Sequence, residues 1–308
     1  MVFKVGPAAQ LLPARRALHG EKPAVSVVIP ALNEARNLPY VLTRMPADVF
    51  EVILVDGGST DGTVEVAQQL RPDIKIVRQT GRGKGNALAC GFAASRGEIV
   101  AMLDADGSTD PAEVPRFVAA LLTGADLAKG SRFASGGGST DLTHLRAMGN
   151  HGLCRLVNLL YGARYTDLCY GYVAFWRDCL PHLNVDCDGF EVETLISIRA
   201  AKAGLVIFEV PSHEGQRVHG SSNLRAWSDG LRVLKTILFE SRIDRRAPGI
   251  ASDPRPGFGW DGVERRSARP HGGHAHRRRA SDRSVLPGAA GTAVSASMPD
   301  DDQRVSEA

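Results

Sequence analysis

The most regular pattern along the chain is a series of short apolar runs bounded by turn residues. Three of these runs are rich in β-branched residues and span Val25–Ile29, Val52–Val55 and Ile99–Leu103. Continuous apolar runs of this length are typical of strands that are buried on both faces of a parallel sheet. Because segments with helical spacing separate them, the pattern predicts a βαβ series and an α/β fold with a doubly wound sheet.

The same patterns predict the remaining elements. Helices are expected over Glu34–Met45, Gly62–Leu70, Asn86–Ser95, Pro111–Leu122, Leu142–Tyr161, Gly189–Ala203 and Leu224–Arg242. Shorter apolar runs predict strands over Ile74–Val77, Ala125–Lys129, Tyr172–Trp176 and Val206–Val210. A Gly-rich loop, Ser135–Thr140, lies between the two halves, and we expect the second half to complete the same sheet.

The composition changes toward the carboxyl end. From Arg245 onward Pro, Gly, Ser, Ala, Arg and His prevail without apolar periodicity. Such a segment buries too little apolar surface to offset its ordering entropy. We therefore predict a flexible segment over residues 1–23, one folded domain over 24–242, and a disordered basic tail over 243–308.

The composition of the whole chain favours a soluble cytoplasmic protein. Hydrophobic residues make up 43% and charged residues 23% of the 308 residues, which suits a globular core. The five cysteines form no CxxC pair, so reduced thiols are favoured over zinc or disulfides. Pro7, Pro13, Arg15 and Arg16 interrupt any signal-peptide core. No apolar run reaches the roughly 18 residues of a spanning helix, so membrane contact is expected to be peripheral.

Two acidic turns follow predicted strands. Asp104 and Asp106 come after Ile99–Leu103, at the sheet edge where ligands of α/β proteins bind. Paired carboxylates there suit a divalent metal that would also neutralise a diphosphate; a plain Asp-rich turn is the alternative. Asp56 follows the neighbouring strand and suits a nucleotide base or ribose; the alternative for this turn is a helix cap by Ser59, Thr60 or Asp61. For Asp61, in the same turn, we favour the cap.

A glycine-rich loop, Gly81–Gly85, offers a third candidate site. It resembles a phosphate cradle, but it lacks the GxxxxGK[ST] spacing, which disfavours a nucleotide triphosphatase. Lys84 in this loop either supplies positive charge near a ligand or belongs to a solvated turn.

Seven motifs in order resemble those of family 2 glycosyltransferases of the dolichol-phosphate mannose synthase type, which act on polyprenyl phosphates. They are VSVVIPALNE (Val25–Glu34), VDGGSTDGT (Val55–Thr63), GKGNALACGFAASRGEIVAMLDADGSTDP (Gly83–Pro111), KGSRF (Lys129–Phe133), DLCYGYVAFWR (Asp167–Arg177), GFEVETL (Gly189–Leu195) and EVPSHEGQRVHGSSNL (Glu209–Leu224). The resemblance implies a GT-A fold, a Rossmann-like mixed sheet flanked by helices that binds a nucleotide-diphosphate sugar.

The resemblance also assigns roles to individual residues. It implies Mg²⁺ or Mn²⁺ at Asp104 and Asp106, with Asp106 catalytic, and a nucleotide-sugar site that includes Pro30, Glu34, Asp56, Lys84, Asp104 and Ser222. Phosphate-gripping, catalytic arginines of the family match Arg132, Arg146 and Arg217. A guanidinium suits this role because it presents planar paired donors. The alternatives are a strand-end charge for Arg132, a solvated helix face for Arg146 and a loop residue for Arg217.

The implied reaction is inverting transfer of a hexose, mannose or glucose, from GDP-mannose or UDP-glucose to a polyprenyl or dolichyl phosphate. A phosphate oxyanion needs no general base. If the acceptor is instead a soluble hydroxyl, Asp167 or Glu193 would serve as base. Leu32 stands where the family often has an aromatic residue, which leaves the identity of the nucleotide base open. Asn150 stands where enzymes that use lipid phosphates tend to have Ser, which leaves the acceptor open.

Two further alternatives concern the basic segments. A non-enzymatic protein could bind polyanions through the basic tail, but the acidic turns would repel such a partner, and we expect no nucleic acid. The segment Leu224–Arg242 mixes apolar and basic residues, which suits either an interfacial helix at a membrane or an ordinary amphipathic helix that closes the domain.

Overall fold

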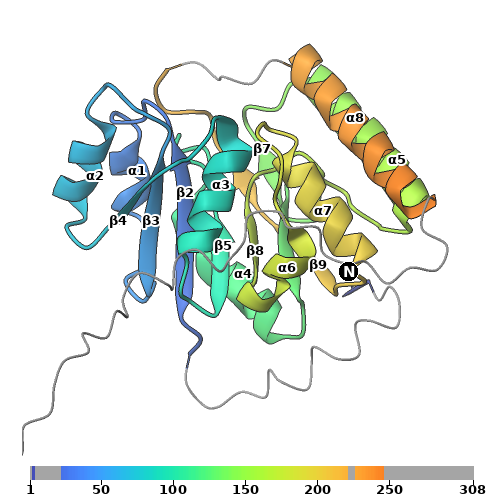
Figure 1. Cartoon of the computed structure of the whole chain (residues 1–308), viewed down its shortest axis with the longest axis horizontal. Helices are drawn as coiled ribbons and strands as arrows, with labels where there is room; N and C mark the ends of the chain where they lie inside the picture. Colours follow the sequence, from blue (N-terminus) through green and yellow to red (C-terminus); the bar gives the residue numbers. More distant parts are fainter. Residues whose placement is uncertain (1, 4–21, 221–225, 246–308) are drawn as a thin grey trace, which may run out of the picture. The chain divides into compact units, whose positions relative to one another are not determined.

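The structure is a computed structural model that describes residues 2–3, 22–220 and 226–245 of the 308. In these residues one eight-stranded sheet has the order β1-β9-β6-β8-β5-β2-β3-β4 (Figure 1). Its strands are β1 (Val2–Phe3), β2 (Val25–Ala31), β3 (Glu51–Asp56), β4 (Lys75–Arg78), β5 (Ile99–Met102), β6 (Leu127–Ser131), β8 (Val173–Trp176) and β9 (Ile207–Pro211). A separate two-stranded parallel sheet pairs β7 (Gly138–Ser139) with β10 (His213–Glu214).

Strand direction divides the large sheet into two parts. β2 pairs in parallel with β3 and β5, and β3 pairs in parallel with β4, which confirms the parallel arrangement predicted from the apolar runs. The second half of the chain completes the same sheet, as expected, but β8 runs antiparallel to both β5 and β6. The sheet is therefore mixed. The carboxyl ends of β2, β3 and β5 meet at one edge, where the acidic turns follow.

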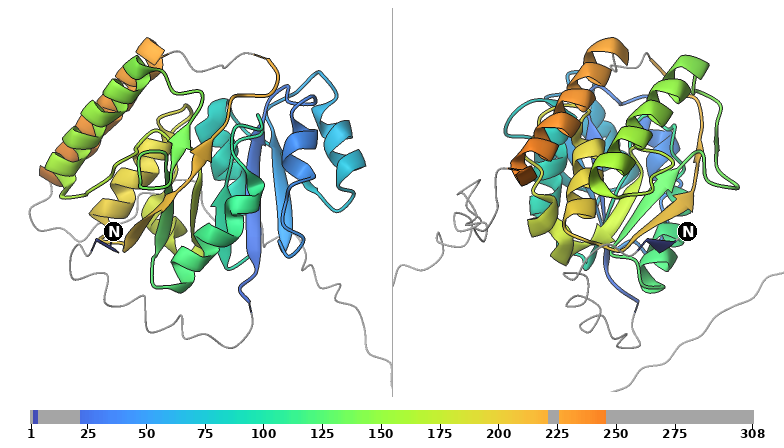
Figure 2. Two further views of the ribbon diagram at one scale, coloured as in Figure 1. Left: turned by 180° about the vertical axis from the view of Figure 1, so that it is seen from behind. Right: turned by 90° about the vertical axis from the view of Figure 1, so that its right-hand side faces the viewer.

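Helices cover both faces of this sheet (Figure 2). They are α1 (Leu38–Leu42), α2 (Thr63–Leu70), α3 (Gly83–Ala94), α4 (Val114–Leu122), α5 (His144–Tyr161), α6 (Leu180–Leu183), α7 (Val192–Lys202) and α8 (Ala226–Arg245). Successive β2 side chains point to opposite faces. Val27 and Ile29 pack in the core that contains residues of α1, α2 and α4, and Val28 packs in the core that contains residues of α3, α5, α7 and α8.

Glycines allow α3 to approach its neighbours closely. A Cβ at Gly91 would lie 2.3 Å from Val28 Cγ1, so the helix rests directly on β2. At its start, a Cβ at Gly83 or Gly85 would lie 2.1 Å from the carbonyl oxygen of Asp188 or Cys187, respectively. The segment Gly83–Gly85 therefore packs against other backbone, which fills the space of a side chain and requires glycine at both ends, while Gly81 and Arg82 before it are exposed.

Several predicted elements differ from the structure. The helix expected over Glu34–Met45 is reduced to α1, because the Glu34 carbonyl accepts hydrogen bonds from the N–H groups of Asn37 (2.9 Å) and Leu38 (3.0 Å) in a tight turn. Sequence patterns missed α6, with the 3₁₀ turn Arg177–Cys179 before it, and the short strands β7 and β10. Val2 and Phe3, in the segment expected to be flexible, pair with β9 as β1.

Some predictions fall beyond the part of the chain that the structure describes. They are Ser222, the rest of the amino-terminal segment up to residue 21, and the basic tail from residue 246 onward. Among the described helices, none has the length and apolar character that a bilayer crossing demands.

Candidate active site

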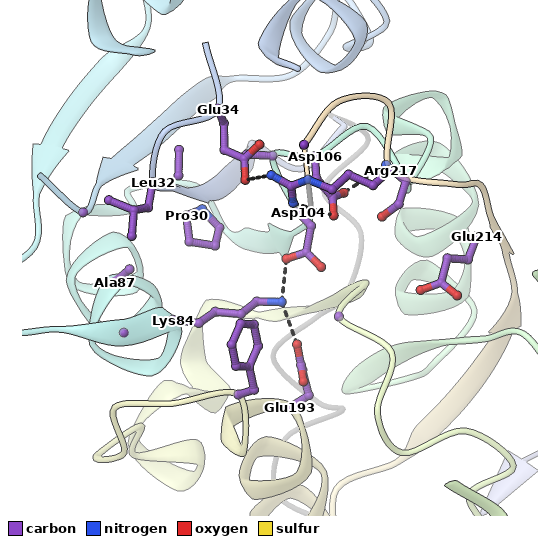
Figure 3. Close-up of a pocket in the computed structure, with 18 of the residues that line it drawn as sticks. Pro30, Leu32, Glu34, Lys84, Ala87, Asp104, Asp106, Glu193, Glu214 and Arg217 are labelled. Atoms are coloured by element: carbon purple, nitrogen blue, oxygen red, sulfur yellow. Dashed lines mark hydrogen bonds and ion pairs between the residues drawn. The ribbon is translucent and has the colours of Figure 1, made fainter. Parts of the chain in front are cut away.

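A pocket of about 680 Å³ opens at the carboxyl edge of β2, β3 and β5. Segments far apart in the chain line it: the turn after β2, the start of α3, the turn after β5, the first turn of α5, α7, and the loop after β10. Seven of the predicted site residues are in its lining, namely Pro30, Glu34, Lys84, Asp104, Asp106, Arg146 and Arg217. Figure 3 shows Asp104 and Asp106 near its centre, with Lys84 and Arg217 directed toward them.

Lys84 lies between two carboxylates in the wall of the pocket. Its Nζ is 2.5 Å from Asp104 Oδ1 and 2.6 Å from Glu193 Oε1. Burial alone would lower the pKa of Lys84, but the negative charges of Asp104 and Glu193 outweigh it and raise the pKa, so the ammonium stays charged. For Glu193, burial raises the carboxyl pKa and Lys84 opposes that shift. Lys84 thus holds the carboxylate of Glu193 as well as that of Asp104.

Arg217 links the other aspartate to the turn after β2. Its Nη1 is 3.4 Å from Asp106 Oδ2, and its Nη2 is 2.5 Å from Glu34 Oε1. The other Glu34 oxygen accepts a hydrogen bond from Asn37 Nδ2 at 2.6 Å. Asn37 in turn accepts one from the backbone N–H of His219 at 2.9 Å. These contacts fix the loop after β10 against the amino-terminal half of the domain and keep Arg217 in the pocket.

Arg132 does not line the pocket. Its side chain is 3% exposed, and its guanidinium donates to both Asp167 oxygens, at 2.7 and 2.9 Å, and to Glu214 at 2.9 Å. Burial would lower the pKa of Arg132, but Asp167 and Glu214 outweigh it and raise it. Glu214 does line the pocket. In this structure Arg132 therefore acts on the pocket through Glu214. Asp167, the candidate base, is fully buried against Arg132, and only Glu193 of the two candidates reaches the pocket.

Arg146 is the pocket arginine with the greatest solvent exposure. It lies in the first turn of α5, where Thr143 Oγ1 caps the helix by accepting a hydrogen bond from the Arg146 N–H. Its Nη1 is 2.9 Å from Asp141 Oδ2, and about a third of the side chain (32%) is exposed. Because exposed ion pairs are weak, Arg146 can exchange Asp141 for an anionic ligand at small energetic cost.

Asn150, one turn further along α5, has a structural role instead. It is 4% exposed, and its Oδ1 accepts hydrogen bonds from the backbone N–H groups of Leu168 and Cys169, both at 3.1 Å. Cys169 lines the pocket. Asn150 therefore holds the segment before β8 in place, which explains a carboxamide at a position where the resemblance favours Ser.

The acidic side chains of the turn after β3 accept hydrogen bonds from backbone N–H groups of the same turn. Asp56 is 4% exposed and accepts from the N–H groups of Gly58 (3.2 Å) and Ser59 (3.0 Å), while Gly57 takes the place in the pocket lining that was predicted for Asp56. Asp61 Oδ1 accepts from the Thr63 N–H at 3.1 Å, at the start of α2. The N-cap of α2 is Gly62, however, and no side chain caps this helix, so the capping role favoured for Asp61 is wrong: its carboxylate bridges the turn before the helix instead.

The pocket also contains residues that sequence reasoning did not select. Glu214, Gln216 and Phe190 belong to its lining, and Lys84 Nζ lies 5.9 Å from the centre of the Phe190 ring. Phe190 lies inside the motif GFEVETL and Glu214 inside the motif EVPSHEGQRVHGSSNL, and this position was the signal that the sequence offered. In isolation, neither residue type indicates a site.

Comparison with known proteins identifies this arrangement. The model of the glycosyl transferase family 2 matches residues 26–182, which include all but the first residue of β2, all of β3 and β5, and Asp104 and Asp106. The chain belongs to glycosyltransferase family 2. Its mixed, helix-flanked sheet is the GT-A fold, and the protein is a glycosyltransferase.

Proteins similar to this family 2 enzyme include a glycosyltransferase and two synthases. It is 32% identical to Glycosyltransferase AglJ of Haloferax volcanii over 67% of this chain and 68% of the relative. It is also 32% identical to the polyprenol monophosphomannose synthase of Mycolicibacterium smegmatis, over 64% of this chain and 80% of that one. A similar solved structure is glucosyl-3-phosphoglycerate synthase of Mycobacterium tuberculosis with Mn²⁺, UDP-glucose and phosphoglyceric acid, at 28% identity, a TM-score of 0.55, and 71% and 80% coverage.

The position of Gly171 gives a test of the Lys84 cluster. A Cβ there would lie 2.9 Å from Asp104 Oδ2, 3.0 Å from Lys84 Nζ and 3.1 Å from Glu193 Oε1. We expect Gly171→Ala to displace these side-chain ends and to lower nucleotide-sugar turnover about tenfold, because small misplacements of reacting groups are costly. The free energy of unfolding should change by only about 1 kcal/mol, since flexible side chains give way.

Gly215→Ala is the matched control, because its Cβ would meet only Ser108 O at an ordinary 3.6 Å. The measurements are release of nucleoside diphosphate and urea unfolding of both variants. Unchanged turnover in Gly171→Ala would show that the Lys84 cluster is not needed in this geometry.

Proposed function

We propose that the enzyme transfers a hexose, mannose or glucose, from a nucleotide-diphosphate sugar to a polyprenyl phosphate, with inversion at the sugar. The observation that carries this proposal is the meeting of two carboxylates, Asp104 and Asp106, with Arg146 and Arg217 in one pocket. Carboxylates suit a metal that accompanies the donor diphosphate, and arginines suit phosphate oxygens. The similarity to a mycobacterial polyprenol monophosphomannose synthase supports the acceptor class.

The residues present fit Mg²⁺ or Mn²⁺. Asp104 and Asp106 supply hard oxygen ligands at the strand end, and the solved relative holds Mn²⁺ together with UDP-glucose. Within the described part of the chain, no group of three or more His, Cys, Asp or Glu side chains is arranged to hold a metal. An ion at the two aspartates would therefore take its remaining ligands from water and the diphosphate, as Mg²⁺ commonly does. When bound, it would stabilise the charge on the leaving diphosphate.

The two sides of the pocket suit different substrates. Pro30, Leu32 and Ala87 lie on one side of Asp104, where their apolar surfaces suit the flat base of a nucleotide (Figure 3). Glu214 lies on the other side. We assign that side to the sugar and the acceptor, and Arg146 to the acceptor phosphate.

The chemistry of the acceptor decides whether a base is needed. A phosphate monoester oxygen is already anionic at neutral pH, so catalysis requires in-line positioning and charge stabilisation only. Arg146 and Arg217 would hold two anionic groups near each other, which one metal ion alone does not neutralise. With the acceptor at a membrane, we place the enzyme at the cytoplasmic face, as a peripheral protein.

A soluble hydroxyl acceptor is the second candidate. The solved relative contains phosphoglyceric acid, a small soluble acceptor. Glu193 lies in the pocket with a raised pKa caused by burial, which is a property of general bases. However, its carboxylate is 2.6 Å from Lys84 Nζ, and this ion pair favours the weakly basic, charged form. The polyprenyl phosphate therefore remains our first choice.

Matched acceptors test the proposal. The purified chain, with Mg²⁺ or Mn²⁺, is given GDP-mannose or UDP-glucose together with a short prenyl phosphate, the same prenol without phosphate, or phosphoglyceric acid. We expect glycosylated product, measured by mass spectrometry, from the prenyl phosphate and none from the prenol. Transfer to phosphoglyceric acid alone would replace this proposal with the hydroxyl-acceptor reaction.

Arg146→Ala tests the acceptor side of the pocket. Because charge-assisted hydrogen bonds contribute about 1.5–3 kcal/mol, we expect a rise in KM for the prenyl phosphate, or a fall in kcat, on the order of tenfold or more. Donor affinity, measured calorimetrically, should change little. Arg155→Ala on the exposed face of the same helix is the control. Equal kinetics of Arg146→Ala and Arg155→Ala on the short acceptor would remove Arg146 from the acceptor site.

A further inference from the structure

Two neighbouring helices carry an exposed apolar surface that the core does not use. α5 and α8 overlap along their lengths in Figure 1 and lie side by side in the right-hand view of Figure 2, and the Tyr161 hydroxyl donates to the Ile237 carbonyl at 2.6 Å. Of the twelve large hydrophobic side chains that are exposed in the described residues, six belong to these helices: Leu145, Met148, Leu159, Leu231, Leu238 and Phe239. We call this surface the α5–α8 face.

The exposed residues are not a leftover of core packing, because each helix already has a buried apolar face. Cys154 and Val157 of α5, and Val233 and Ile237 of α8, are at most 6% exposed and pack in the core. Phe239, by contrast, is 64% exposed. Each helix is therefore apolar on two sides, one toward the sheet and one toward solvent. An ordinary amphipathic helix that closes a domain has only the first.

The charge on the α5–α8 face has one sign. Arg155, Lys235 and Arg242 are exposed there among the apolar residues, and no Asp or Glu is exposed on either helix within 144–161 and 228–242. α5 contains no acidic residue at all. On α8, Glu240 is turned inward, where it pairs with Arg199 and Lys202 at 2.8 and 2.9 Å.

A surface that is apolar and whose exposed charges are all basic favours a partner with apolar and anionic groups. A helix with this composition lies well at the interface of a bilayer that contains anionic lipid, with apolar side chains among the acyl chains and basic ones at the headgroups. A second copy of the chain would place Lys235 and Arg242 against like charges in a two-fold interface, which is unfavourable. We propose that the α5–α8 face is a docking surface for an anionic lipid bilayer.

The location of this face explains its use. Arg146 lines the pocket, while its neighbours Leu145 and Met148, in the same first turns of α5, are 64% and 72% exposed on the α5–α8 face. A bilayer on this face therefore lies next to the acceptor side of the pocket. This purpose rests on the proposed polyprenyl-phosphate acceptor, because a headgroup in the bilayer could then reach Arg146 without leaving the membrane. The docking itself does not depend on it.

Vesicle co-sedimentation of the full chain tests the docking. The vesicles contain phosphatidylcholine alone or phosphatidylcholine mixed with phosphatidylglycerol. One variant combines Leu238→Ser with Phe239→Ser, and a second combines Lys235→Glu with Arg242→Glu. A control combines Leu70→Ser with Leu122→Ser, which are exposed apolar positions (40% and 38%) on α2 and α4. The basic residues beyond 245 are present in every variant, so their contribution cancels in the comparison.

We expect the wild type and the control to bind the anionic vesicles and both α5–α8 variants to bind them on the order of tenfold more weakly. Equal binding of all four proteins, or no binding by the wild type, would overturn the proposal. A dimer in light scattering that only the two variants dissociate would assign the face to a second copy instead.

Turnover of a short, water-soluble prenyl phosphate separates this proposal from the proposed function. Both variants should retain that turnover, because neither change touches the pocket, and should lose transfer to a long-chain acceptor in vesicles. If the wild type binds the vesicles but uses neither prenyl phosphate, the docking surface stands and the proposed acceptor fails.

Discussion

Six carboxylates line the pocket at the carboxyl edge of the sheet, and their mutual repulsion has to be balanced by cations of the chain itself. Lys84 joins Asp104 to Glu193, and Arg217 joins Asp106 to Glu34. Partly buried charges without partners would cost several kcal/mol each. The positions of α3, which carries Lys84, and of the loop after β10, which carries Arg217, therefore depend on these pairs as much as on apolar packing.

The same pairs explain how the pocket would receive its substrates. A divalent ion at Asp104 and Asp106 would compete with Lys84 and Arg217 for carboxylate oxygens, so an ion that arrived alone would deprive these two side chains of some of their present partners. A diphosphate that arrived with the ion would supply further oxygen ligands to it and would give both side chains new anionic partners. Ion and donor should thus bind with positive coupling, while Arg146, with its weak partner Asp141, stays available for a second anion.

Much of this was predictable from the sequence because it depends on local pattern. The runs at Val25 and Ile99 indicated parallel strands, and parallel strands bring their following residues to one edge, so Asp104 and Asp106 were correctly placed in the pocket. What escaped prediction depends on distant partners. Arg132 is engaged by Asp167, 35 residues away, and Lys84 by Glu193, 109 residues away. Arg132 and Arg217 both lie in motifs that match the family. No local spacing reveals that Arg217 lines the pocket while Arg132 is buried in ion pairs with Asp167 and Glu214.

Titration of Mn²⁺, followed by electron paramagnetic resonance, tests the charge balance most directly. The protein is titrated alone and with UDP or GDP, the metal bound to free nucleotide is subtracted, and Asp106→Asn is measured alongside. We expect Mn²⁺ to bind at least about tenfold more tightly when the nucleoside diphosphate is present, within the usual range of coupling between sites, and Asp106→Asn to lose that gain. Equal Mn²⁺ affinity with and without nucleotide, or an Asp106→Asn variant that behaves like the wild type, would contradict the assignment of the two aspartates to the metal and donor.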